Sequence, residues 1–132
     1  MHKIKVETTG TREVVDVTPS VSRVLREIGV MSGVCHLFVP HTTAGITINE
    51  NTDPNVRHDL LQALERMVPA AAHYLHAEGN SAAHILATLM GSSAMAFVEN
   101  GKLVLGAWQA LYLFEHRDAP HTREIALHLI GE

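Results

Sequence analysis

The feature that most constrains the fold of this chain is a series of short segments in which apolar and polar residues alternate. A period of two residues is typical of β-strands that bury one face. Asn100-Gly101 separates two of these segments and is the strongest short hairpin signal in the chain. Another pair of segments flanks Thr9-Gly10-Thr11, which predicts a further hairpin. The predicted strands cover residues 3–8, 12–17, 33–39, 46–49, 95–98, 103–105, 110–115 and 123–130.

Three other segments carry apolar residues three and four positions apart, which is the spacing of a helix. Each begins at a residue that can cap a helix and ends at a glycine or a proline. The starts and ends are Thr18-Pro19 and Gly29, Asp53-Pro54 and Pro69, and Ser81 and Gly91. This order predicts an α+β fold, a single domain over residues 1–132 in which two or three helices cover a mostly antiparallel mixed sheet. So few helices leave apolar sheet surface uncovered, which favours a partner subunit.

The composition limits the classes of function. The net charge is −4 and there is no basic run, which argues against a general nucleic-acid binder. No apolar stretch approaches the ~20 residues that span a bilayer, and the first residues alternate, unlike a secretory signal. The single cysteine, Cys35, lies in an apolar run and is expected to be a buried, inert thiol. These features predict a cytoplasmic protein.

Polar residues gather in three clusters within this otherwise apolar chain. The clusters are 41–44 with 49–51 and 53, 76–81 with 84, and 106–109 with 115–117. His41 follows a predicted strand, His76 lies on a loop, and His84 lies in a first helical turn, where the dipole favours a neutral imidazole. Three neutral imidazoles can hold a divalent metal and leave one position open. Their spacing matches no local metal motif, so the alternative that each is an ordinary loop or helix residue stays open.

Other residues of these clusters suit an anion. Gly79-Asn80-Ser81 precedes a helix N-terminus, where free backbone N–H groups favour an oxyanion such as phosphate. Thr42 and Thr43 could add hydroxyl donors, and the alternative is a simple capping loop. Arg117 or Arg123 could bind a phosphate, and the alternative, favoured for Arg123, is a solvated strand face. Glu115 lies on the same side of the predicted strand as Arg117, so the two could act together.

The remaining candidates have equally plain alternatives. Glu50 and Asp53 could bind a hard cation or act as a base, although Asp53 is also a good helix cap. Asn49 could contact a ligand or form a turn. Trp108, the single tryptophan, could pack in the core or at an interface, or form a stacking wall beside a flat heterocyclic ligand.

Together these residues resemble the YjbQ-like family, also named the secondary thiamine-phosphate synthase family. The resemblance runs over nearly the whole chain. It rests on His41-Thr42-Thr43-Ala44, Thr47-Ile48-Asn49-Glu50-Asn51 with Asp53-Pro54, His76 with Glu78-Gly79-Asn80, Ala83-His84-Ile85, Gly106 with Trp108-Gln109, Glu115-His116-Arg117 and Arg123. The family's usual Gly-Thr-Trp-Gln-Gly is Gly106-Ala107-Trp108-Gln109-Ala110 here, a departure that alters either ligand approach or only packing.

The resemblance implies a small α+β fold that assembles as a homotrimer, with sites near subunit interfaces. It implies a divalent metal, Zn or Mg, on His41, His76 and His84. It also implies a weak thiamine-phosphate synthase activity, which joins a pyrimidine pyrophosphate to a thiazole phosphate and releases pyrophosphate. A cation would neutralise charge on this leaving group, and Arg117 with Gly79-Asn80-Ser81 would hold phosphate.

Two functions are therefore expected. The first is a metal-assisted transferase of the thiamine-phosphate synthase type, acting on a small phosphorylated molecule. The second is a non-catalytic trimer that holds a metal or an anion. The expected catalytic residues are Glu50, Asp53, Glu115 and Arg117, the ligand-binding residues are Thr42, Thr43, Asn49, Gly79, Asn80, Ser81 and Trp108, and the metal ligands are His41, His76 and His84. A bound phosphate or sulfate is expected, whereas no nucleic-acid or membrane partner is.

Overall fold

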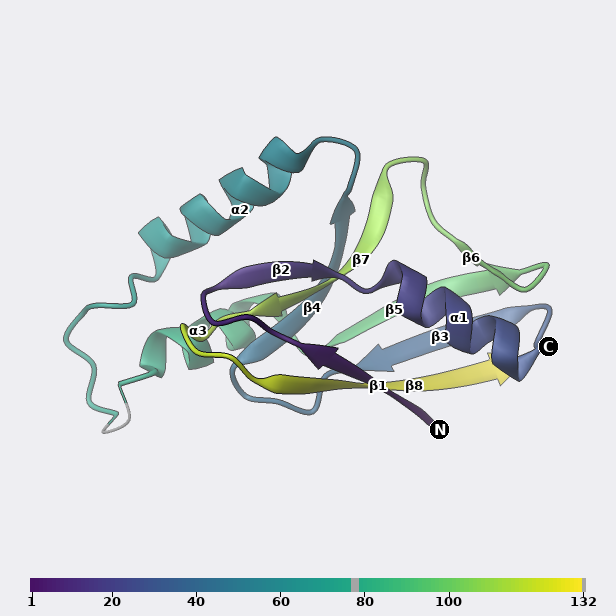
Figure 1. Ribbon diagram of the computed structural model, residues 1–132, viewed down its shortest axis with the longest axis horizontal. Helices are drawn as coiled ribbons and strands as arrows, with labels where there is room; N and C mark the ends of the chain where they lie inside the picture. The colour runs from purple at the N-terminus through teal and green to yellow at the C-terminus, as the bar shows by residue number, and fades with distance from the viewer. Residues whose placement is uncertain (77–78, 132) are drawn as a thin grey trace.

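The computed structural model describes residues 1–76 and 79–131, which form two antiparallel sheets and three helices (Figure 1). The predicted α+β class is confirmed, although the strands divide between two sheets and do not share one. Along the chain the elements are β1 (His2–Glu7), β2 (Glu13–Asp16), α1 (Thr18–Ile28), β3 (Gly33–Phe38), β4 (Ala44–Glu50), α2 (Pro54–Met67), α3 (Ser81–Met90), β5 (Ser93–Glu99), β6 (Lys102–Val104), β7 (Gln109–Glu115) and β8 (Thr122–Gly131).

The strand partners confirm one predicted hairpin and overturn the other. One sheet has the order β1-β8-β3-β5-β6, and the second has the order β2-β7-β4. The hairpin of residues 3–8 and 12–17 is wrong, because β1 pairs with β8 and β2 pairs with β7. Gly10, with a φ of 134°, lies in the connection between the two sheets. Asn100-Gly101 does join β5 to β6, and its φ values of 52° and 73° are those of a tight two-residue turn.

The main core lies between the two sheets, where Val21 and Leu25 of α1 are fully buried beside alternate residues of the strands. Cys35 is also fully buried, and this burial raises the pKa of its thiol to about 11, as expected for an inert cysteine. The other face of the three-stranded sheet carries Tyr112 and Phe114 and packs against α2 and the end of α3. Because side chains alternate along a strand, neighbouring residues of β7 point into two different compartments.

The helix ends follow only part of the prediction. Asp53 caps α2 by accepting a hydrogen bond of 2.9 Å from a backbone N–H two residues later. Thr18 and Ser81, predicted as caps, are the first residues of α1 and α3. Asn80 occupies the N-cap of α3, but its side chain makes no capping hydrogen bond. No helix in the described ranges is long and apolar enough to cross a bilayer.

The outer face of the five-stranded sheet carries large apolar side chains that stay exposed. They alternate along the strands with the core residues. They are Phe38, Met95, Phe97, Val104 and Ile130, each 45–56% exposed. An uncovered apolar sheet face was expected from the small number of helices.

Candidate functional site

The end of β7 directs two adjacent side chains into opposite compartments. Glu115 points between the two sheets and is fully buried, and His116 points toward α3 and is 3% exposed. The period of two in a strand produces this separation. A buried charge and a buried imidazole therefore occupy neighbouring positions with different partners.

Glu115 forms an ion pair with Arg123 of β8. The Arg123 Nε donates to Glu115 Oε1 at 2.9 Å, and its Nη2 bonds Glu115 Oε2. The hydroxyl of Thr8 adds a bond of 2.8 Å, and the backbone N–H of Arg117 adds one of 3.2 Å. Burial would raise the pKa of Glu115, but the hydrogen bonds from Arg123 and Thr8 hold this pKa below its usual range. Glu115, expected to be catalytic, has the contacts of a structural anchor that fixes the start of the 116–119 segment.

Thr43 belongs to the same anchor. Its hydroxyl accepts a hydrogen bond of 2.9 Å from Arg123, and the side chain is buried. Thr42 is exposed on the same loop. Neither threonine lines the pocket described next, so their expected role as ligand donors finds no support within one chain.

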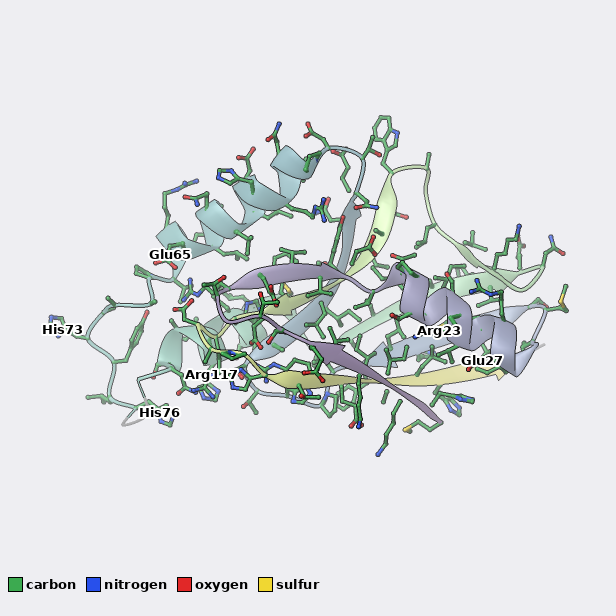
Figure 2. All side chains as sticks on the ribbon, viewed as in Figure 1. Arg23, Glu27, Glu65, His73, His76 and Arg117 are labelled. Atoms are coloured by element: carbon green, nitrogen blue, oxygen red, sulfur yellow. The ribbon has the colours of Figure 1, made fainter. Side chains whose placement is uncertain are left out.

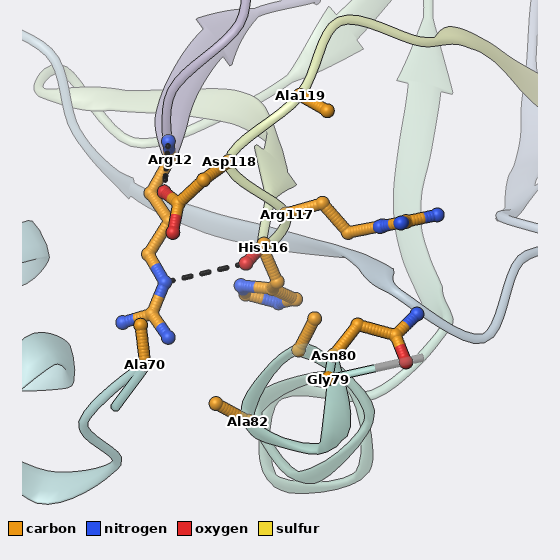
Figure 3. A pocket seen from close by; sticks show the side chains of 10 residues that line it. Arg12, Ala70, Gly79, Asn80, Ala82, His116, Arg117, Asp118 and Ala119 are labelled. Carbon is orange, nitrogen blue, oxygen red and sulfur yellow. Dashed lines mark hydrogen bonds between the residues drawn. The ribbon is translucent and has the colours of Figure 1, made fainter. Parts of the chain in front are cut away.

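His116 faces a pocket of about 200 Å³ between α3 and the segment that follows β7 (Figure 3). We call this the α3 pocket. Arg12, Asn80, His116, Arg117 and Asp118 are its polar lining residues. Glu65 pairs with Arg12 from outside the pocket, so the charges of Arg117 and Asp118 leave the lining close to neutral. The first turn of α3 adds the positive end of a helix dipole, so the pocket favours an anion.

Two polar atoms of the α3 pocket are buried without a hydrogen-bond partner among the described residues. They are Nε2 of His116 and Oδ1 of Asn80. Figure 3 shows the His116 ring directed toward α3, on the side where Asn80 lies. Buried polar atoms are nearly always bonded, so a ligand that reaches either atom would supply its missing partner.

His116 is neutral near pH 7. Burial and the nearby charge of Arg12 lower the pKa of this imidazole to about 4. A neutral imidazole carries one N–H and one bare nitrogen, so His116 can either donate or accept a hydrogen bond in the pocket.

Arg12 braces the pocket from outside α3. Its Nε donates to the carbonyl of His116 at 3.3 Å, and its guanidinium bonds the carbonyl of Val68 and the carboxylate of Glu65. Sequence reasoning missed Arg12 because its partners lie 53 to 104 positions away. A single arginine in an alternating segment carries no local sign of such contacts.

Arg117 is held by a histidine that the sequence also did not identify. Its Nη1 lies 3.2 Å from Nε2 of His121, while Nδ1 of His121 lies 2.7 Å from the carbonyl of Ala119. The short contact to the carbonyl assigns the proton of His121 to Nδ1, which leaves Nε2 free to accept from Arg117. Figure 2 places Arg117 beside α3, where it can meet an anion in the pocket.

The three histidines expected to bind a metal do not form such a site within one chain. The rings of His76 and His84 lie 5.3 Å apart between centroids. His41 uses Nε2 to accept a hydrogen bond of 2.9 Å from the backbone N–H of Glu124. Burial, with the charge of Arg123, lowers the pKa of His41. Over residues 1–76 and 79–131, no three His, Cys, Asp or Glu side chains gather in a way that could hold a metal ion. Among the residues that the structure describes, one subunit therefore offers no complete site for the implied metal.

A second group of expected site residues lies at the other end of the three-stranded sheet. β4 pairs with β7 so that Ala44 faces Glu115 and Glu50 faces Gln109. Six steps of a strand place these ends about 20 Å apart. Glu50 and Asn49 end β4, Asp53 caps α2, and Trp108 is 66% exposed on the loop before β7.

This remote group has its own internal contacts. The hydroxyl of Tyr112 donates to Asn51 Oδ1 at 2.7 Å, and the Asn49 side chain accepts from the N–H of Glu50 at 2.7 Å. Trp108 contributes its carbonyl to the N–H of Asn51 at 2.8 Å. The core role considered for Trp108 is wrong, because its indole is exposed. Within one chain, Glu50, Asp53, Asn49 and Trp108 cannot share a ligand with the α3 pocket.

Of the predicted anion loop, Gly79 and Asn80 line the pocket, and Ser81 is the first residue of the adjacent helix. Glu78, which the family resemblance included, lies outside the described residues. The structure thus brings Gly79, Asn80 and Arg117 together as expected, and adds His116, Arg12 and His121.

Comparisons with known proteins find similar sequences over nearly the whole chain. A sequence model of the family described as "UPF0047 protein YjbQ-like" matches residues 2–132. The Bacillus subtilis protein "UPF0047 protein YugU" is 43% identical over 99% of each chain. "UPF0047 protein MJ1081" of Methanocaldococcus jannaschii is 41% identical, with 100% of this chain and 95% of that protein covered.

Solved structures agree with the fold. A Clostridium acetobutylicum protein, described as an uncharacterized conserved protein of the YjbQ/UPF0047 family, is 45% identical and has a TM-score of 0.93, covering 98% of this chain and 100% of its own. A Sulfolobus solfataricus protein, described as YbjQ-like and of unknown function, is 32% identical and has a TM-score of 0.92, covering 99% and 96%. With its sequence matched nearly end to end and its two sheets reproduced in these structures, this chain belongs to the UPF0047, YjbQ-like family.

Proposed function

We propose that the α3 pocket binds the phosphate group of a small phosphorylated molecule, and that the protein is an enzyme acting on that molecule. The observation that carries this proposal is a pair of buried atoms, Nε2 of His116 and Oδ1 of Asn80, that have no hydrogen-bond partner among the residues the structure describes. Leaving a buried polar atom unbonded costs about 1–3 kcal/mol. A ligand that bonds both atoms recovers this energy, and Arg117 and the N-terminus of α3 favour a negative charge on it.

With the amide of Asn80 oriented as the structure has it, the unpartnered atoms favour a ligand that offers both a donor and an acceptor. Asn80 Oδ1 can only accept, so the ligand must supply a donor. A phosphate monoester that carries one proton, or a hydroxyl beside the phosphate, meets this need. The neutral imidazole of His116 can donate to a second phosphate oxygen.

The size of the α3 pocket limits what it encloses. Its volume of about 200 Å³ is below the roughly 300–1,000 Å³ of sites that enclose a whole drug-sized ligand. It therefore suits a phosphate head group, while the rest of the ligand extends beyond the pocket.

The specific reaction we propose is the one that the family resemblance implies: a pyrimidine pyrophosphate and a thiazole phosphate are joined and pyrophosphate leaves. In this reaction Arg117 would stabilise the charge that develops on the leaving pyrophosphate, and His116 would donate a hydrogen bond to it. The divalent metal that the resemblance implies, Zn or Mg, stays an expectation for the assembled protein. Neither the charge of Arg117 nor the hydrogen bond from His116 requires that metal.

The binding step is tested by calorimetry with inorganic pyrophosphate. Arg117→Ala should weaken binding at least about tenfold, because a charge-assisted hydrogen bond contributes about 1.5–3 kcal/mol. Arg23→Ala, at an exposed arginine of α1 far from the pocket in Figure 2, is the matched control and should bind like the wild type. Equal affinity in the Arg117 and Arg23 variants would refute the assignment of the α3 pocket.

The catalytic step is tested by measuring thiamine phosphate formed from the two precursors. Arg117→Ala should lower the rate, and Arg23→Ala should leave it unchanged. If the wild-type protein binds pyrophosphate but forms no product, the enzyme part of the proposal fails. The second candidate, a non-catalytic anion-binding protein, then remains, and it is favoured by the anchoring contacts of Glu115, which leave the pocket without an assured acid–base pair.

Assembly as a homotrimer belongs to the same proposal. The exposed apolar side chains on the outer face of the five-stranded sheet support a subunit contact there. A charge placed at Phe97, 56% exposed, should shift the protein to a smaller species in size-exclusion chromatography with light scattering. The buried free thiol of Cys35 supports the reducing cytoplasm as the location.

A further inference from the structure

A second hollow of the molecule lies between α1 and the β5–β6 hairpin. Its volume is about 580 Å³, which falls in the range of roughly 300–1,000 Å³ that is typical of small-molecule sites. We call it the α1 groove. It shares no lining residue with the α3 pocket, so it is independent of the function proposed above.

The chain connections build the α1 groove. Gly29, with a φ of 77°, ends α1 and turns the chain toward β3. The N–H of Gly101 then donates to the carbonyl of Met31 at 2.9 Å, which ties the tip of the hairpin to this turn. β6 is the last strand of its sheet, so the space beside it is open to a ligand.

The lining of the α1 groove is mostly apolar. Val30, Met31, Leu103 and Leu105 contribute aliphatic and thioether surface. Met31 is 61% exposed although it is a large apolar residue. Covering this surface with an apolar ligand would contribute roughly 25 cal/mol for each Å² removed from water.

Two cations stand beside the apolar surface. Arg26, in the last turn of α1, and Lys102, the first residue of β6, both line the groove. Neither forms an ion pair with any described residue. The C-terminal end of α1 carries about half a negative charge, which is less than the two full positive charges. The groove therefore favours an anionic head group.

We propose that the α1 groove binds a small amphiphilic anion, with an aliphatic or aromatic body and one carboxylate or sulfonate. The body lies against Val30, Met31 and Leu103, and the head group lies between Arg26 and Lys102. Charge complementarity commits the groove to such an anion and disfavours a cation, and the apolar lining disfavours a polar sugar.

The test uses 8-anilinonaphthalene-1-sulfonate, an aromatic sulfonate whose fluorescence rises on apolar surfaces, with decanoate as competitor. The double variant Arg26→Glu/Lys102→Glu should bind the probe about tenfold more weakly, from the loss of two exposed charge contacts and the repulsion that replaces them. Met31→Asp should weaken it as well, and circular dichroism checks that this change at an exposed position leaves the fold intact. Arg23→Glu, on the same helix outside the groove, is the control and should bind as the wild type does.

Three results would overturn the assignment. The first is unchanged affinity in the double variant. The second is loss of probe binding on Phe97→Glu alone, which would locate the probe on the outer sheet face. The third is a changed oligomeric state in the double variant, which would make the α1 groove a contact between copies of this chain. Pyrophosphate binding in the double variant should equal that of the wild type, which separates this proposal from the one on the α3 pocket.

Discussion

Replacing Arg123 with methionine should cost this protein a large part of its stability. The Arg123 side chain is only 6% exposed and bonds both carboxylate oxygens of Glu115, which is fully buried. Methionine keeps most of the side-chain volume but removes the charge. Glu115 would then keep its bonds to Thr8 and to a backbone N–H, and a longer contact of 3.4 Å with Nδ1 of His121.

The magnitude follows from the uncompensated charge. Removing one partner of a buried ion pair costs about 3–5 kcal/mol. For a chain of 132 residues, a loss of 1 kcal/mol lowers Tm by roughly 4 °C. Arg123→Met should therefore lower Tm by about 10–20 °C. The free energy of unfolding of a natural domain is only about 5–15 kcal/mol, so the loss of this ion pair would remove a large fraction of it.

Urea denaturation and calorimetry measure this loss, with two further variants. Lys3→Met is the matched control, because Lys3 forms an exposed pair with Glu124 at 3.6 Å and such pairs contribute about 0–1 kcal/mol. The double variant Glu115→Gln/Arg123→Met removes both charges and should be more stable than Arg123→Met alone. If Arg123→Met costs no more than Lys3→Met, Glu115 is not an anchored charge and the account of the site is wrong.

Three other predictions concern the same region. In His116→Phe, the free energy of unfolding should depend less on acid pH than in the wild type. In the unfolded wild type the imidazole of residue 116 takes up a proton below about pH 6.5, whereas the pKa of buried His116 in the folded protein is about 4. The wild type should therefore lose up to about 3 kcal/mol as the pH falls from 6.5 to 4, and equal slopes in urea unfolding of both proteins would contradict this. The pKa of Glu115 is lower in the folded protein than in the unfolded chain, so its carboxylate stabilises the fold above the unfolded pKa of about 4.3. This stabilisation is lost as the pH falls through the folded pKa. Glu115→Gln should lack this pH-dependent loss in the same urea titration. His121→Ala should weaken pyrophosphate binding about fivefold, because Arg117 loses one hydrogen bond; His121→Gln, which keeps an acceptor, should recover part of it, and calorimetry showing no change in either variant would exclude a positioning role.

The candidate site shows how far local patterns reach. Gly79, Asn80 and Arg117 were recognisable because each belongs to a local signal, a helix start or a charged strand end. Arg12, His116 and His121 were not assigned a role, because their contacts depend on segments far apart in the sequence. Nε2 of His116 is buried only because α3 packs near the end of β7, so its missing hydrogen-bond partner can be recognised from the folded structure alone.

The sequence by itself determined the features that depend on a few neighbouring residues. Asn100-Gly101 specified a hairpin, Asp53-Pro54 specified a helix start, and alternating apolar residues specified the strands. Apart from that hairpin, the tertiary structure decided which strands pair, because backbone pairing is much the same for any two strands and packing makes the choice. As a result, β1 and β2 lie in different sheets. His41 accepts a hydrogen bond from the backbone N–H of Glu124 and does not meet the histidines with which it was expected to bind a metal. A hydrogen bond or a burial cost acts through space, so which distant residues share a pocket is set by the folded arrangement.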